Sequence, residues 1–246
     1  MYRFFTDASH IDGGRIRITG PDVNHIRNVL RMKPGEQVLI STGDEWEYTC
    51  SIEETDDAEV ICRILDSQKS GKELPSKIVL YQCLPKGDKM ETVIQKAVEL
   101  GAARIVPVES KRCVVRLDAK KKAAKVKRWN AVSEAAAKQS KRMIIPEVAE
   151  VMTYEEMLRD AAKLDSRFVP YEKSRGMDRT RELFSQIRLG QSIGILIGPE
   201  GGFEEKEVER AEAAGFHAVT LGKRILRTET AGMTMLSILM YLLETD

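Results

Sequence analysis

The chain has 246 residues, of which 42% are hydrophobic and 31% charged, and 39 Lys and Arg against 38 Asp and Glu give a formal net charge of +1. This composition is that of a globular protein and excludes a disordered, collagenous or disulfide-rich chain. The longest nearly apolar stretch, residues 231–243, is shorter than the ~20 residues that span a bilayer, so no membrane partner is expected. The first ten residues contain no secretory signal, which makes a cytoplasmic protein the default.

The cysteines are far apart in the sequence and have few histidines to combine with. Zinc ligands come in close pairs, so we expect no metal site. Each cysteine lies in a segment typical of a strand or the end of a strand, which predicts buried reduced thiols rather than nucleophiles. These residues are Cys50, Cys62, Cys83 and Cys113.

Residues 67–76 have the composition of a linker, with Gly71, Pro75 and three serines and no apolar periodicity. We therefore expect two domains, residues 1–72 and residues 73–246. In the first, residues 21–31 are typical of a helix with Pro21 in its first turn. Alternating apolar residues predict a small β-rich barrel or sandwich, with strands over 15–19, 37–41, 45–52 and 59–65.

After the linker, apolar runs alternate with amphipathic segments, which indicates an α/β domain with a mostly parallel sheet. Capping boxes are predicted for Asp88 with Glu91 and for Thr153 with Glu156. Further helices are predicted over 119–141, 204–214 and 229–243, the last capped by Thr228. The predicted strands cover residues 78–83, 105–108, 168–171, 193–197 and 216–221.

Residues 111–142 hold 12 Lys and Arg against only Asp118 and Glu134. Like charges at this density repel one another, and an anionic partner offsets that repulsion most easily. The segment favours a nucleic-acid backbone over a merely solvated helix face, while an acidic protein partner stays open. Nothing within it separates RNA from DNA.

Two irregular loops follow predicted strands near the C-terminus. The first, Gly198-Pro-Glu-Gly-Gly202, has neither the Lys-Ser/Thr ending of a P-loop nor the spacing of a dinucleotide fingerprint. Acidic residues beside it predict a neutral or positively charged ligand. The second loop, residues 221–228, carries Gly222 and several cations. Loops at the carboxyl ends of parallel strands are where open α/β sheets bind ligands.

Five segments occur in a fixed order along the chain. They are Lys86-Gly-Asp-Lys-Met-Glu91, Gln95-Lys-Ala-Val-Glu-Leu-Gly101, Glu134-Ala-Ala-Ala-Lys-Gln-Ser140, Gly198-Pro-Glu-Gly-Gly202 and Ile225-Leu-Arg-Thr-Glu-Thr-Ala231. Together they resemble the RsmE family of 16S rRNA uridine-N3 methyltransferases. Residues 25–31 with Gly35 are similar to that family's N-terminal PUA-like, RNA-binding domain. Cys113 and Gly232 depart from the family pattern, outside its core motifs.

The resemblance implies a SPOUT-type α/β domain with a C-terminal trefoil knot, preceded by a small PUA-like barrel. It implies S-adenosylmethionine bound in the knot, a homodimer with the active site at the subunit interface, and 16S rRNA or the small ribosomal subunit as substrate. Carried onto this sequence, the cofactor-binding residues are Leu196, Ile197, Gly198, Pro199, Gly201, Gly202, Leu221, Gly222, Ile225, Leu226, Arg227 and Thr228.

Methylation of uridine N3 requires loss of the N3 proton. A carboxylate can accept that proton, and an arginine can stabilise the developing oxyanions. We assign Arg227 the electrostatic role and leave Glu200 and Glu229 open as proton acceptors, since one could hold a loop and the other cap a helix. Expected RNA contacts are Arg3, Arg27, Arg31, Lys111, Arg112, Lys121, Lys125 and Arg128.

Two other functions stay open. A non-catalytic RNA-binding adaptor of ribosome assembly needs the basic segment but leaves the glycine loops unused. A nucleotide-dependent metabolic enzyme uses those loops but leaves the basic segment unexplained and lacks a phosphate motif. Each explains less of the sequence than a methyltransferase does.

Overall fold

The structure is a computed structural model that describes residues 1–44, 46–69 and 71–245. Glu45, in an expected strand, and Ser70, in the expected linker, lie outside the described residues. The chain divides into two compact units, Met1–Glu73 with Ala137–Ile145, and Leu74–Ala136 with Pro146–Asp246. Within the described residues, no helix has the length and apolar character needed to cross a membrane.

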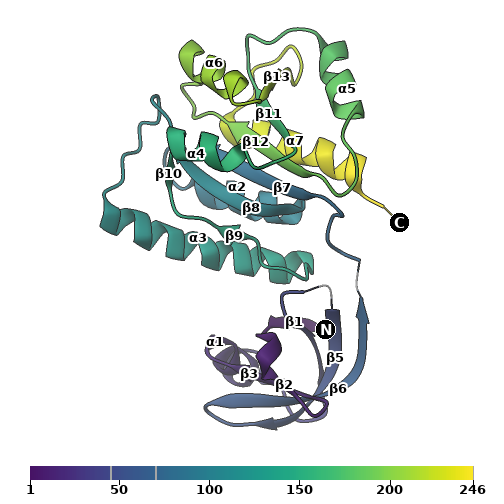
Figure 1. Cartoon of the computed structure of the whole chain (residues 1–246). Helices are drawn as coiled ribbons and strands as arrows, with labels where there is room; N and C mark the ends of the chain where they lie inside the picture. Colours follow the sequence, from purple (N-terminus) through teal and green to yellow (C-terminus); the bar gives the residue numbers. More distant parts are fainter. Residues whose placement is uncertain (45, 70, 246) are drawn as a thin grey trace. The chain divides into compact units, whose positions relative to one another are not determined.

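The N-terminal unit is organised around a sheet of order β1-β4-β5-β6-β3-β2, which is antiparallel except for the parallel β1 and β4 (Figure 1). The predicted helix is present as α1 (Pro21–Asn24) and a π-helical turn, η2 (His25–Val29). The four predicted strands are confirmed, and β1 and β2 were missed. The strands are β1 (Tyr2–Phe5), β2 (Ile11–Asp12), β3 (Arg15–Thr19), β4 (Gln37–Ser41), β5 (Trp46–Thr55) and β6 (Glu59–Lys69).

The alternation of buried and exposed residues along the strands explains the core of this unit. In β3 every second residue is buried, so Ile16 and Ile18 face inward while Arg15 and Arg17 face outward. The inward side chains of neighbouring strands complete a single apolar cluster. The sheet is therefore two-sided, with one face packed and the other polar.

In the C-terminal unit all described strand pairs are parallel, which confirms the predicted sheet. The order is β10-β8-β7-β12-β11-β13, with β9 beside β8. The carboxyl ends of β7, β12, β11 and β13 consequently share one edge. The strands are β7 (Lys77–Cys83), β8 (Ala102–Glu109), β9 (Glu147–Val148), β10 (Met152–Thr153), β11 (Ser166–Pro170), β12 (Ser192–Ile197) and β13 (His217–Val219).

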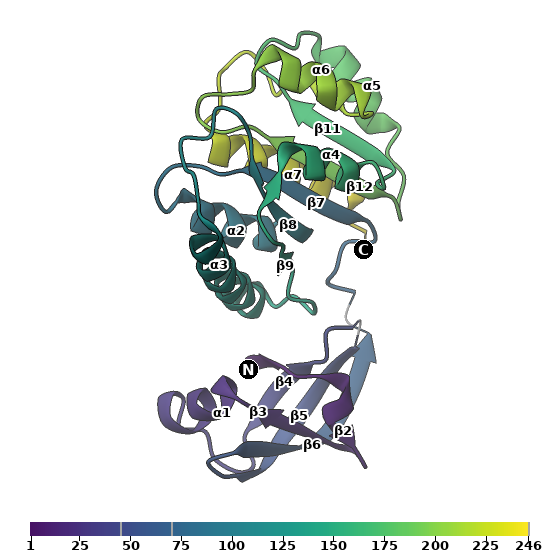
Figure 2. The ribbon, with the colours of Figure 1, turned by 60° about the vertical axis from the view of Figure 1, so that its left-hand side comes forward.

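Helices cover this sheet on both faces. α7 packs on α2 and on β7 and β12, and α4 is joined to α6 by a 2.6 Å hydrogen bond from the Tyr154 hydroxyl to the Glu207 carbonyl. Figure 2 shows α4 in front of the strands and α7 behind them. The helices are α2 (Lys89–Glu99), α3 (Ala119–Ser140), α4 (Tyr154–Ala161), α5 (Met177–Ser185), α6 (Glu205–Ala213) and α7 (Thr228–Leu243).

The helix starts confirm one predicted cap and correct two. Thr153 and Glu156 form the expected capping box of α4. Asp88 precedes α2 but makes no side-chain cap, because its backbone, with φ −95° and ψ 10°, lacks the extended conformation of a capping residue. Glu91 pairs with Arg128. Thr228 lies inside the first turn of α7 and does not cap it.

The cysteines are buried free thiols, as predicted. Cys113 lies in the loop after β8, however, and not in a strand. Its Sγ lies 3.3 Å from the Ser110 hydroxyl and 3.4 Å from the Ser110 backbone nitrogen, so Ser110 provides polar partners for this buried thiol.

Candidate functional site

A cavity of about 1190 Å³ lies where β7, β12, β11 and β13 end. Three loops line it, residues 170–177, 197–203 and 220–228, together with Lys89 from the start of α2. Both loops predicted from their glycines therefore meet at one site, because parallel strands bring their carboxyl ends to the same edge. Sequence analysis missed the third loop, residues 170–177, which carries no motif and is recognisable only by its place after a strand.

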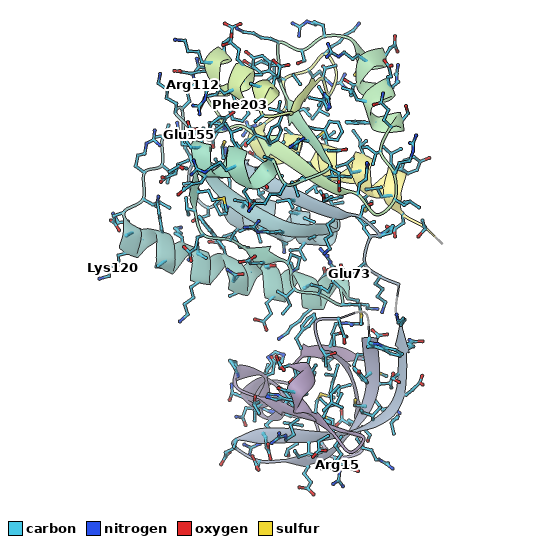
Figure 3. All side chains as sticks on the ribbon, in the orientation of Figure 1. Arg15, Glu73, Arg112, Lys120, Glu155 and Phe203 are labelled. Carbon is cyan, nitrogen blue, oxygen red and sulfur yellow. The ribbon has the colours of Figure 1, made fainter. Side chains whose placement is uncertain are left out.

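The glycine loop has room for backbone alone. A Cβ added at Gly198 would lie 3.0 Å from the Phe203 ring, and Gly202 has a φ of +66°. Arg112 donates a 3.0 Å hydrogen bond to the Gly201 carbonyl; Figure 3 labels Arg112 and Phe203. The loop is thus held between an aromatic ring and a guanidinium, in a backbone conformation that favours glycine.

Thr228 ties three segments together at the buried end of the cavity. Its hydroxyl donates a 2.6 Å hydrogen bond to the Gly198 carbonyl and accepts a 2.8 Å bond from Nε2 of Gln82. The end of β7, the glycine loop and the start of α7 therefore share one buried connection. This role replaces the helix cap that the sequence predicted for Thr228.

Glu200 is the carboxylate of the glycine loop that lines the cavity. Its Oε1 accepts hydrogen bonds from Lys89 Nζ at 2.9 Å and from the Lys86 backbone N–H at 3.0 Å. Burial alone would raise the pKa of Glu200, but these donors outweigh burial and hold that pKa below its ordinary value. The Glu200 carboxylate is therefore ionised at neutral pH.

The acidic residues that follow the glycine loop do not line the cavity. Glu204 pairs with Lys111, and the buried Glu207 accepts the Lys111 backbone N–H, so neither lines the cavity. Cations outnumber acids among the lining residues, which favours an anionic ligand at the exposed side. The charged lining residues are Glu172 and Glu200 against Lys89, Lys173, Arg175, Lys223, Arg224 and Arg227.

Most of the predicted cofactor residues line the cavity. Leu196 does not, because it is fully buried within β12, and Gly201 does not, because its carbonyl faces Arg112. Among the catalytic candidates, Arg227 and Glu200 line the cavity and Glu229 does not. The predicted residues that line it are Ile197, Gly198, Pro199, Gly202, Leu221, Gly222, Ile225, Leu226, Arg227 and Thr228.

The proposed RNA contacts separate into accessible and inaccessible residues. Arg3 is a correction: its side chain is 2% exposed and its guanidinium pairs with Glu47, so it has no surface to offer RNA. Arg27 pairs with Asp57, and Arg31 is exposed with a left-handed φ of 53°. Left-handed backbone in a non-glycine residue is unusual and marks a tight turn.

The predicted contacts of the basic segment lie at the surface or close to it. Lys121 pairs with Asp118, while Arg128 pairs with Glu91 and is 62% exposed. Figure 3 shows Lys120 pointing outward from the first turn of α3.

Within the described residues, no group of three or more His, Cys, Asp or Glu side chains could hold a metal ion.

Comparisons with known proteins identify the family. An RNA methyltransferase domain model matches residues 72–240, and an RNA methyltransferase PUA domain model matches residues 18–65. The ribosomal RNA small subunit methyltransferase E of Bacillus subtilis is 38% identical over 98% of this chain and 96% of its own length, and that of Mesomycoplasma hyopneumoniae is 33% identical over 96% and 98%.

A crystal structure of the Neisseria gonorrhoeae ribosomal RNA small subunit methyltransferase E bound to S-adenosyl methionine matches with a TM-score of 0.85. The identity is 33%, over 98% of each chain. These matches confirm the family predicted from the motifs and a PUA-like N-terminal domain. The chain belongs to the ribosomal RNA small subunit methyltransferase E family.

Proposed function

We propose that this protein transfers a methyl group from S-adenosylmethionine to N3 of a uridine in the 16S rRNA of the small ribosomal subunit. The observation that carries the proposal is the cavity at the carboxyl ends of β7, β12, β11 and β13. Its lining combines apolar side chains, such as Ile197, Leu221 and Leu226, with more cations than acids. That combination suits an uncharged adenosine beside a polyanionic substrate.

The residues present fit S-adenosylmethionine. The glycine peptide groups lie beside the apolar side chains of Ile197, Leu221 and Leu226, and no phosphate-binding motif accompanies them. The volume of about 1190 Å³ exceeds the roughly 300–1,000 Å³ of most ligand pockets. It therefore has room for a nucleotide beside the cofactor. Leu196 and Gly201 would support this site from behind rather than touch the cofactor.

When bound, S-adenosylmethionine supplies an electrophilic methyl group that uridine N3 takes as the carbon–sulfur bond breaks and a neutral thioether leaves. The chain's own contribution is to orient the base and manage its proton. Arg227, at the cavity, stabilises the developing charge on the uridine oxygens. A carboxylate, Glu200 or Glu229, accepts the N3 proton directly or through one water.

The family also supports finer features of the architecture. We propose that the C-terminal part of residues 73–246 forms the trefoil knot of SPOUT methyltransferases and that residues 1–72 close into an RNA-binding barrel. The protein would act as a homodimer in the cytoplasm, with the active site at the subunit interface. Exposed apolar side chains on α7, Tyr241 and Leu242, support a partner at that helix.

RNA contact is proposed for two groups of residues. Arg27 and Arg31 lie at the turn after α1, and the others lie in the loop after β8 or on α3. Arg3 is excluded because it is buried. The contacts in the second group are Lys111, Arg112, Lys121, Lys125 and Arg128.

Calorimetric titration with S-adenosylmethionine, NAD and ATP tests the cofactor. We expect only S-adenosylmethionine to bind, and Gly198→Leu to weaken binding by about 100-fold because the added side chain meets Phe203. Circular dichroism of the variant controls for folding. Binding of NAD or ATP in its place would contradict the proposal.

Methylation of small-subunit RNA, followed by mass spectrometry of its nucleosides, tests the reaction. The expected product is a uridine methylated at N3. A protein that binds RNA but no S-adenosylmethionine, even with that RNA present, would be an adaptor. A methylated nucleoside other than a uridine would contradict the base assignment.

A further inference from the structure

Lys89, the first residue of α2, lies between two carboxylates that come from different segments. Its Nζ donates a 2.9 Å hydrogen bond to Oε1 of Glu200, from the loop after β12. The same Nζ lies 3.8 Å from Oε2 of Glu229, in the first turn of α7. The three side chains are 34%, 27% and 20% exposed, so the cluster is partly shielded from water.

The two carboxylates are not equivalent. Glu200 lines the cavity, and the donors from Lys86 and Lys89 both meet its Oε1 rather than Oε2. Glu229 is absent from the lining residues, and its Oε2 is buried with no hydrogen bond in the described part of the chain. Of these two carboxylates, Glu200 is therefore the one that lines the cavity.

We propose that Lys89 is a positioning residue that holds Glu200 in place as the proton acceptor, and that Glu229 acts on Lys89 rather than on the uridine. This inference rests on the proposed function and decides between its two candidate bases. In the step assigned to Glu200, the N3–H bond breaks and the proton goes to Oε2. The electron pair stays on the uridine ring, where Arg227 faces the developing charge.

Charge explains why two carboxylates are needed. The charged groups that act on Lys89 are Glu200, Glu229 and Arg227, and the hydrogen bond to Glu200 is the largest influence raising the Lys89 pKa. Arg227 opposes it, since two cations repel. The negative charge of Glu229 offsets the repulsion between Lys89 and Arg227 and keeps the Lys89 ammonium beside Glu200. Because one oxygen of Glu200 is occupied by donors, the other is held in a defined direction.

Nuclear magnetic resonance titration of the Glu200 carboxyl carbon, in protein without cofactor, tests the inference independently of activity. We expect Lys89→Met to raise the Glu200 pKa by about one pH unit or more, and Lys89→Arg to restore most of the wild-type value. Lys96→Met, on the same helix but paired with Glu99, is the matched control and should change nothing. An unchanged Glu200 pKa in Lys89→Met overturns the inference.

Single-turnover methylation against pH gives the second measurement. Glu200→Gln should lower the rate about 100-fold, as expected for loss of a general base, with S-adenosylmethionine affinity retained. Lys89→Met should move the acid limb to higher pH, and Glu229→Gln should lower the rate by only ~3–10-fold. A larger loss in Glu229→Gln than in Glu200→Gln overturns the assignment. A wild-type protein that methylates no RNA refutes the proposed function, while the titration still decides the Lys89–Glu200 pair.

Discussion

At the scale of single residues, Arg3 shows how burial changes the meaning of a charge. Its guanidinium pairs with Glu47 and donates a 2.6 Å hydrogen bond to the Ser41 hydroxyl. Burial alone would raise the pKa of Glu47, but hydrogen bonds from Lys72, Arg3 and Gln68 outweigh it and hold that pKa below its ordinary value of 4.5. Arg3 therefore stabilises the N-terminal sheet and does not meet RNA.

This pair makes stability depend on pH. Because the folded pKa of Glu47 is lowered, its stabilisation is present above about pH 4.5 and is lost as the pH falls through the folded pKa. Glu47→Gln should cost about 3 kcal/mol at pH 7 and flatten the acid limb of stability against pH. Urea unfolding followed by Trp46 fluorescence measures both effects.

Glu53→Gln is the control, since Glu53 pairs with Arg15, whose side chain is 62% exposed. An exposed pair contributes at most about 1 kcal/mol, so this variant should behave nearly as wild type. An acid limb in Glu47→Gln as steep as that of the control would show that Glu47 does not stabilise the fold through its charge.

At the scale of elements, α3 divides its cations into two groups. Trp129 and Val126 are buried and hold one side of the helix. Lys122, Arg128 and Lys138 form ion pairs with Glu109, Glu91 and Asp22. Within the described residues, Lys120, Lys125 and Lys127 form none. The basic run is thus partly structural, and Lys120, Lys125 and Lys127 are cations that can be replaced without breaking an ion pair in the described part of the chain.

The unpaired group predicts a salt effect. Replacing Lys120, Lys125 and Lys127 with Glu should reduce the slope of log K against log salt for RNA binding by about 2–3, if each contacts one phosphate. Helix content should stay the same, because none of the three is buried. The same exchange at Arg181, Arg188 and Lys206 is the control. Equal slopes in both triple variants would remove α3 from the RNA interface.

At the scale of the whole molecule, the N-terminal unit is discontinuous in sequence. Residues 137–145 group with residues 1–73. Glu73 explains much of this: it pairs with Arg142 and accepts hydrogen bonds from the backbone N–H groups of Met143 at 2.8 Å and Ile144 at 3.2 Å. A carboxylate that accepts several hydrogen bonds stabilises the contact between the segments that it connects.

Removing that carboxylate should loosen one unit more than the other. Glu73→Ala should lower the stability of the N-terminal unit by about 2 kcal/mol, because it leaves partly buried donors unpaired. Hydrogen exchange should then quicken in β1 and β4 and stay unchanged in β7 and β12. Glu36→Ala, in an exposed loop, is the control. Uniform quickening in both units would mean that Glu73 supports the fold globally.

Local patterns predicted what depends on neighbours in sequence. Alternation located β3 and β4, and Thr153 with Glu156 located the start of α4. Strands of two residues such as β2, β9 and β10 are too short to show a period and were missed. Asp88 and Thr228 have residue types typical of helix caps, but neither caps its helix. At the start of α2 Glu91 pairs with Arg128, and at the start of α7 the Thr228 hydroxyl donates to the Gly198 carbonyl. Both partners are far away in the chain.

The sequence by itself determined the family, the parallel sheet, both glycine loops and most of the candidate residues that line the cavity, because these depend on residue type and short spacing. The tertiary structure alone decided that Arg3 is buried, that loop 170–177 joins the cavity and that cations dominate its lining. It also placed Lys89 between Glu200 and Glu229. Those four results depend on contacts between segments distant in sequence, and burial and pairing exist only once the chain has folded.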